Sequence, residues 1–153
     1  MTVIGVISDT HGLLRPEAIE ALRGVRKIIH AGDVGEPKVL RELEKVAPVV
    51  AVRGNVDGAW ANHIPTSQVV EVDDVSIYVL HILEELDLKP EEARLSAVVY
   101  GHSHQPKVEQ KNGVLYFNPG SAGARRFRLP VSIGKLTVTR GRLSAQIIEL
   151  DVR

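Results

Sequence analysis

Residues 2–12 of the chain read TVIGVISDTHG, an apolar run that passes directly into a polar turn. The apolar part is rich in β-branched residues and has no polar face, which is typical of a central strand covered on both sides. Further strands are expected at residues 27–31 and 49–52, and helices at residues 16–22 and 37–45, each helix opened by a proline. This β-α-β-α-β order predicts parallel strands with right-handed crossovers.

The second half of the chain is richer in strands. They are expected at residues 68–72, 75–81, 97–100, 114–117, 132–138 and 143–150. The pairs Asp73-Asp74, Asn112-Gly113 and Arg140-Gly141 indicate hairpin turns. Residues 83–95 are expected to be mostly helical, with a break near Pro90. We therefore predict an α/β chain that forms one domain over residues 1–153, with two mixed β-sheets packed together and helices outside.

Composition limits the classes of function. The 19 acidic residues balance 19 basic ones, which removes any bulk electrostatic reason to expect dedicated nucleic-acid binding or an anionic membrane as partner. There is no cysteine, so disulfides and thiolate metal sites are excluded and any metal must be bound through nitrogen and oxygen. No apolar stretch approaches the roughly 20 residues of a membrane span, and no basic leader precedes the first strand. We expect a cytoplasmic protein.

Polar residues of particular types follow the predicted strands. They are Asp9, His11, Asp33, Asn55, His81, His102 and His104. Ligand sites in open α/β sheets lie beyond the carboxyl ends of strands, where loops carry function on a rigid scaffold. Each cluster also has a neighbouring glycine, which permits a sharp turn and close approach of a ligand. Carboxylate, imidazole and amide groups together suit divalent manganese, iron, zinc, cobalt or nickel, and a carboxylate can bridge two ions.

Each of these motifs has a simpler explanation when taken alone. Asp9 could cap a helix, Asp33 and Asn55 could be ordinary turn formers, and His102 and His104 could be turn residues. Taken together, in order and at strand ends, they indicate a metal site.

The ordered motifs resemble the calcineurin-like metallophosphoesterase superfamily, and in particular its small single-domain phosphodiesterases. The resemblance rests on Asp9-Thr-His11-Gly, the run from Ile29 to Asp33, Gly54-Asn55, His81, Gly101-His102-Ser-His104 and Asn118-Pro-Gly-Ser121. It implies a four-layer αββα sandwich. It also implies that Asp9, His11, Asp33 and His104 hold one divalent metal and that Asp33, Asn55, His81 and His102 hold a second, manganese by expectation, with a bridging hydroxide as nucleophile.

Two positions depart from the superfamily pattern. Val56 stands where many members have a histidine that helps protonate the leaving group, and Leu83 stands where a histidine usually follows the metal ligand corresponding to His81. Loss of a general acid puts a rate factor of about 10²–10⁴ at stake. We consider His63 and Asp57 as weak candidates for a substitute catalytic group, with a surface position and a turn role as the respective alternatives.

The predicted function is metal-dependent hydrolysis of a small phosphate ester, with diesters that carry good leaving groups preferred over unactivated monoesters. The alternative is a catalytically weak scaffold module with the same fold, similar to the phosphoesterase-fold subunit of retromer. Among Arg125, Arg126 and Arg128, one arginine could bind phosphate, and a solvated loop is the other interpretation. The oligomeric state is left open, with a homodimer as one alternative.

Overall fold

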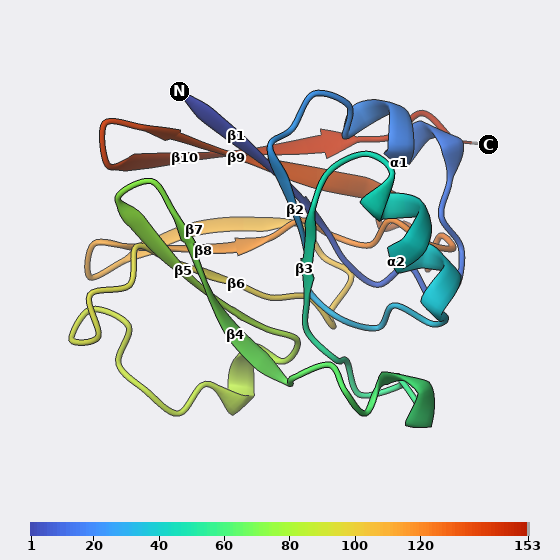
Figure 1. Cartoon of the computed structure of the whole chain (residues 1–153), viewed down its shortest axis with the longest axis horizontal. Helices are drawn as coiled ribbons and strands as arrows, with labels where there is room; N and C mark the ends of the chain where they lie inside the picture. The colour runs from blue at the N-terminus through green and yellow to red at the C-terminus, as the bar shows by residue number, and fades with distance from the viewer. Residues whose placement is uncertain (153) are drawn as a thin grey trace.

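The computed structural model describes residues 1–152, which form two five-stranded sheets packed face to face (Figure 1). The first sheet has the order β10-β9-β1-β2-β3, with strands at Arg142–Glu149, Ser132–Thr139, Thr2–Ile7, Lys27–His30 and Val49–Ala51. The second has the order β4-β5-β6-β8-β7, with strands at Ser67–Val72, Val75–Leu80, Ala97–Val99, Val114–Asn118 and Lys107–Lys111. Both sheets are mixed, as the sequence predicted.

Each sheet combines parallel strands with antiparallel ones. In the first sheet β1, β2 and β3 are parallel, and the β9–β10 hairpin pairs antiparallel with β1. In the second sheet β5, β6 and β8 are parallel, and β4 and β7 are antiparallel partners at the two edges. The carboxyl ends of the parallel strands therefore carry the loops that hold the polar motifs.

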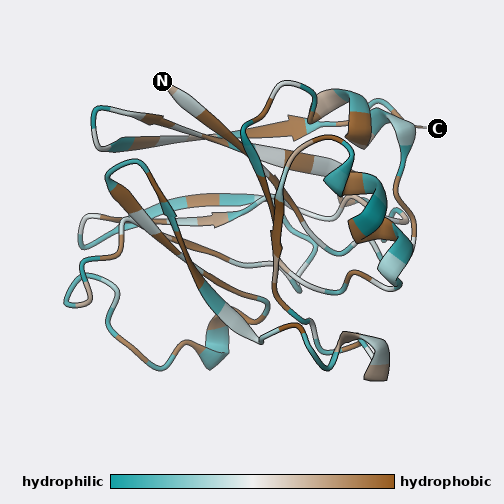
Figure 2. Cartoon of the chain, viewed as in Figure 1, coloured by the Kyte–Doolittle hydropathy of each residue, from teal (hydrophilic) through white to brown (hydrophobic). Residues whose placement is uncertain are grey.

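Two α-helices, α1 (Pro16–Ala21) and α2 (Pro37–Glu44), cover the outer face of the first sheet (Figure 1). Proline at the start of each helix supplies the preorganised φ of a first helical position and forgoes an N–H that would have no partner there. Ala18 in α1, Leu22 directly after it and Leu43 in α2 are fully buried against the sheet. A second core lies between the two sheets, where Ile4, Phe117 and Leu136 have no exposed surface. Hydrophobic residues accordingly run along the strands, while the connecting loops are more hydrophilic (Figure 2).

The predicted helix over residues 83–95 is wrong. This segment contains only the 3₁₀ turn η2 (Leu83–Glu85), followed by irregular structure and turns. Pro90 divides it into two pieces too short to form helices, and the residue before a proline is disfavoured in the α-region. Leu83 and Leu86 still pack against the outer face of the second sheet, so a loop takes the place of the fourth, helical layer.

A second 3₁₀ turn, η1 (Ala59–Ala61), links β3 to β4. Across residues 1–152, every helix is too short or too polar to cross a membrane.

Candidate metal centre

The loops at the carboxyl ends of the parallel strands bring together all seven residues predicted to bind metal. These residues follow β1, β2, β3, β5 and β6 and are Asp9, His11, Asp33, Asn55, His81, His102 and His104. Two backbone hydrogen bonds join the first two loops, from the Asp9 N–H to the Gly32 carbonyl and from the His11 N–H to the Asp33 carbonyl, each at 3.0 Å. The parallel pairing of β1 with β2 thus sets the spacing between the two aspartates.

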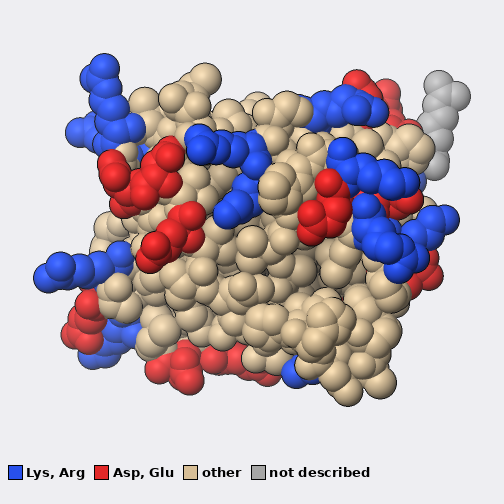
Figure 3. All heavy atoms as spheres, in the orientation of Figure 1, with Lys and Arg blue, Asp and Glu red and all other residues tan. Residues whose placement is uncertain are grey.

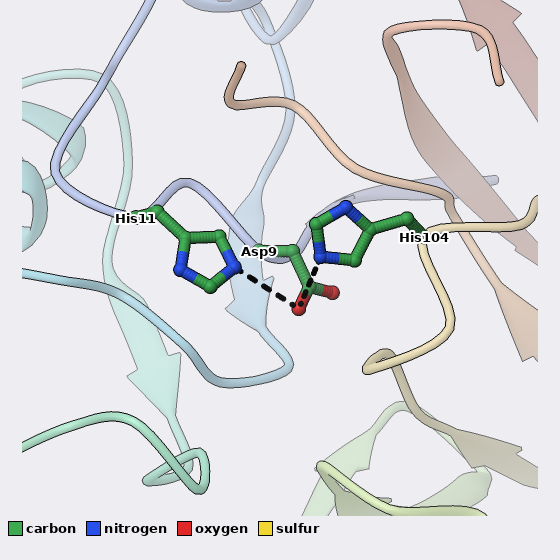
Figure 4. Close-up of side chains that lie close together, drawn as sticks. All are labelled: Asp9, His11 and His104. Carbon is green, nitrogen blue, oxygen red and sulfur yellow. Dashed lines mark ion pairs between the residues drawn. The ribbon is translucent and has the colours of Figure 1, made fainter. Parts of the chain in front are cut away.

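Three imidazole rings surround one oxygen of the fully buried Asp9 carboxylate. Nε2 of His104 lies 3.4 Å from Asp9 Oδ1, and Nε2 of His11 lies 3.7 Å from the same atom (Figure 4). Nε2 of His81 is 3.8 Å away. Within residues 1–152, Asp9 Oδ1 has no hydrogen-bond partner. Asp9, His11 and His104 therefore form a compact group of oxygen and nitrogen donors with space for a cation between them.

The other Asp9 oxygen is held by its neighbours. Oδ2 accepts hydrogen bonds from the Ser8 hydroxyl at 2.7 Å and from the backbone N–H of His102 at 3.1 Å. Burial alone would raise the pKa of the Asp9 carboxyl. The close imidazoles of His104 and His11, the nearby charge of His81 and the hydrogen bond from Ser8 instead hold that pKa well below its usual range, so Asp9 is a carboxylate that is fixed in orientation.

A second group lies beside the first and meets it at Asp33. Nε2 of His81 is 3.1 Å from Asp33 Oδ2, and Nδ1 of His102 is 3.2 Å from Asn55 Oδ1. Asp33 Oδ2 also lies 3.7 Å from Nε2 of His11, which belongs to the first group. Asp33 is thus placed between two sets of donors, as a bridging carboxylate would be.

The protonation of His81 follows from its contact with the backbone. Its Nδ1 lies 2.7 Å from the Ala31 carbonyl, which can only accept, so Nδ1 carries the hydrogen and Nε2 faces Asp33 and Asp9. Metal-ligating histidines commonly donate their other ring N–H in this way. Burial would lower the pKa of His81, but Asp33, Asp9 and the Ala31 carbonyl together raise it above its ordinary value.

Backbone strain is concentrated at this site. Five of the seven residues have φ between 48° and 74° and are Asp9, His11, Asp33, His102 and His104. Such left-handed conformations cost on the order of 1–3 kcal/mol each in residues other than glycine, and they persist where the surrounding structure enforces them. These five residues lie in the loops after β1, β2 and β6, and their strained backbone turns the side chains of the three loops toward one point.

Two glycines are required by close packing around the aspartates. A Cβ at Gly54 would collide with the Asp33 carboxylate, and one at Gly101 would collide with the Ser8 hydroxyl. The glycines next to the predicted ligands thus allow the loops to approach each other.

Asp57 faces the backbone. Its carboxylate accepts hydrogen bonds from the N–H groups of Val34 at 3.2 Å, Gly35 at 2.9 Å and Gly54 at 2.9 Å. These bonds tie the loop after β2 to the loop after β3, which carry Asp33 and Asn55. The structure therefore gives Asp57 a positioning role, although it was considered as a catalytic group.

His63 and His30 lie outside the group of seven predicted metal ligands. His63 is exposed in the turn after η1, and within the described residues it makes no hydrogen bond or ion pair. His30 is fully buried, with Nε2 3.0 Å from the Thr10 hydroxyl, and its Nδ1 accepts a hydrogen bond from the Gly32 N–H. Burial lowers the pKa of His30 to about 4, so it is a neutral residue that supports the loops from behind.

Sequence comparison identifies the family. Residues 1–141 match the calcineurin-like phosphoesterase superfamily domain. The chain belongs to this superfamily. It is 35% identical to a probable metallophosphoesterase of Methanothermobacter thermautotrophicus, over 95% of this chain and 91% of that protein. It is 32% identical to a phosphodiesterase of Methanocaldococcus jannaschii, over 76% of this chain and 82% of that protein.

Structural comparison gives the same fold. Vps29 of Chaetomium thermophilum superimposes with a TM-score of 0.79 and covers 98% of this chain and 97% of its own, at 19% sequence identity, which is evidence for the fold alone. Membership of the superfamily confirms the predicted phosphoesterase class and the two-sheet architecture. The nitrogen and oxygen donors of the two groups also fit the divalent metal binding that the family implies.

Proposed function

We propose that this calcineurin-like phosphoesterase is a phosphodiesterase that acts with two divalent cations, manganese by preference. The first would be held by Asp9, His11, Asp33 and His104, and the second by Asp33, Asn55, His81 and His102. The observation that carries the proposal is the environment of Asp9 Oδ1, a buried oxygen without a hydrogen bond that faces three imidazole nitrogens. Bound divalent ions would lower the pKa of water and neutralise charge on the phosphoryl group.

The chain itself contributes orientation. Ser8 and the His102 N–H fix the Asp9 carboxylate, while the Ala31 carbonyl fixes the His81 ring. Such supporting contacts typically account for a factor of about 10–100 in metal affinity or activity. These contacts fix the orientation that the proposed ligands need.

The position of the missing histidine explains the expected substrate preference. The Val56 side chain is 55% exposed, and this residue contributes only its backbone N–H, which donates to Asp33 Oδ1 at 3.0 Å. No side chain at this position can protonate a leaving group. We therefore expect a diester with an acidic leaving group, such as an aryl alcohol, to be hydrolysed much faster than an alkyl monophosphate.

Charge distribution is consistent with a small substrate. On the face shown in Figure 3, acidic and basic side chains are interspersed and form no single-sign stripe of the kind that tracks a nucleic-acid backbone. The net charge of +0 points in the same direction.

Hydrolysis of an aryl phosphodiester by metal-stripped protein, with and without added manganese, tests the proposal. We expect turnover only with metal, turnover reduced about 10²–10³-fold in His104→Ala, and much slower turnover of an alkyl monophosphate. Metal binding without turnover above the variant would refute the phosphodiesterase assignment and favour the scaffold alternative. Equal rates for both substrates would refute the leaving-group argument alone.

A further inference from the structure

A hollow of about 290 Å³ opens beside the second group of donors. The residues around it include Arg53, Asn55, Thr66, His81, Ile82 and Glu85. Two of these, Asn55 and His81, are proposed metal ligands, so the hollow is continuous with the site. It is large enough for a phosphate group and part of an ester arm, since one water molecule occupies about 30 Å³ of liquid volume.

Arg53 is the only arginine or lysine among the described residues that line the hollow, whose lining also includes the carboxylate of Asp57. It is half-buried, and within residues 1–152 its guanidinium takes part in no hydrogen bond and no ion pair. Even Glu85, which lines the same hollow, forms no ion pair with it. Partial burial of an unpaired guanidinium costs solvation energy, which contact with an anion would offset. An anionic ligand in the hollow would therefore stabilise the Arg53 side chain.

The backbone around Arg53 is held in place. Its N–H donates to the Pro65 carbonyl at 2.8 Å, and the N–H of the next residue, Gly54, donates to the Asp57 carboxylate at 2.9 Å. Asn55 follows directly in the sequence. The guanidinium is therefore attached to the same rigid segment that carries a proposed metal ligand, which keeps its position relative to the site constant.

The chemistry of the side chain selects the anion. A guanidinium has a planar set of donors that matches two oxygens of a phosphate, and it stays charged at all ordinary pH values. It cannot act as a general acid for the same reason. An arginine at this place can hold the phosphate group but cannot replace the missing leaving-group histidine.

We propose that Arg53 is a substrate-binding residue that anchors the phosphate group of the diester from the side of Asn55 and His81. This inference rests on the proposed phosphodiesterase function. It assigns the substrate to the hollow beside the second metal group, and it predicts that inorganic phosphate binds there as well.

The test compares Arg53→Met and Arg53→Lys with Arg142→Met, a matched control in the exposed hairpin strand β10. Metal content, kcat and KM for an aryl phosphodiester, and calorimetric binding of inorganic phosphate to the metal-loaded protein are measured for each. Loss of a charge-assisted contact predicts that KM and the phosphate Kd rise about 10- to 100-fold in Arg53→Met. Arg53→Lys should lie between that variant and the wild type, and the control should match the wild type.

Three results would overturn the inference. The first is a KM and a phosphate Kd that stay within twofold of the wild type. The second is a fall in kcat with both constants unchanged, because anchoring must appear in binding. The third is a loss that follows metal content and is reversed by excess manganese, which would make Arg53 a support for Asn55. Failure of the proposed function differs from all three, because the wild type itself would then show no turnover.

Discussion

The two halves of the proposed metal centre differ in how completely the protein builds them. In the half around Asp9, the carboxylate is fully buried, His104 is 3% exposed, and one oxygen faces three imidazoles, of which only that of His11 reaches the surface. In the half around Asp33, both Asn55 and His102 are exposed, and a hollow opens next to them.

This difference separates two tasks within one site. A more enclosed, prearranged set of donors binds an ion more tightly because less entropy is lost and charges are less screened. An open set exchanges its ion more readily and gives a substrate access. We infer that the Asp9 half retains its metal while the Asp33 half receives the phosphate, and the following predictions test this division.

The largest effect is expected at the residue that joins the halves. Asp33→Asn removes the negative charge that both ions would share, and we expect kcat/KM for an aryl phosphodiester to fall by at least about 10³-fold, equivalent to about 4 kcal/mol. The measurement is steady-state turnover with manganese, with circular dichroism to show that the variant is folded. Activity within tenfold of the wild type would contradict a bridging role.

The contributions of the two halves can be distinguished by substituting one histidine in each. His104→Ala and His102→Ala should each reduce activity by about 10²–10³-fold, because each loses a metal ligand. Their metal contents should differ after dialysis. His102→Ala should retain one tightly held ion, whereas His104→Ala should lose that ion.

Inductively coupled plasma mass spectrometry measures these stoichiometries. Equal retention of metal by the two variants would show that the halves are equivalent.

His30, which is buried behind the loop that carries Asp9, should make the free energy of unfolding depend on pH. His30 has a pKa of about 4 in the folded protein against about 6.5 when unfolded, so only the unfolded chain takes up a proton between these values. Stability therefore falls as pH decreases from 6.5 to 4, by about 3 kcal/mol from this residue. His30→Gln keeps an N–H for Thr10 but cannot titrate.

Urea unfolding of metal-free wild type and His30→Gln at pH 7, 5 and 4 measures this difference. The wild type should lose more stability than the variant over this range. Parallel pH profiles for the two proteins would mean that His30 does not titrate as proposed.

The smallest effect is expected at Asp57, which supports the loops of the Asp33 half. Asp57→Asn weakens three hydrogen bonds to the loops that carry Asp33 and Asn55. We expect a 10- to 100-fold loss of activity and weaker binding of the second metal, with the first metal retained. Turnover together with manganese titration tests this. If the first metal is lost as readily as the second, the loops do not act independently.

Much of the site could be predicted from sequence because its residues stand directly after apolar strands. A buried parallel strand ends at a defined edge, so Asp9 and Asp33 come near one another once β1 and β2 are assigned as neighbours, whereas His102 follows β6 of the second sheet and reaches them through the packing of the two sheets. The predicted helix over residues 83–95 does not form. Its conformation is determined by Pro90 and by the packing of Leu83 and Leu86 on the second sheet.

Contacts that depend on distant loops could not be predicted. Nothing in the sequence indicates that the His102 N–H orients the Asp9 carboxylate, or that Asp57 binds the backbone near Val34. Arg53 also gave no signal, because an arginine after a strand is common on protein surfaces. Its significance comes from the hollow and from the absence of a partner within residues 1–152.

The central claim is that seven residues hold two ions that share Asp33. Electron paramagnetic resonance of the metal-stripped protein during titration with manganese tests it most directly. The account predicts the spectrum of an isolated ion up to one equivalent and that of a magnetically coupled pair at two equivalents, with no coupling in Asp33→Asn. Two uncoupled ions in the wild type, or a single binding event, would contradict the shared site.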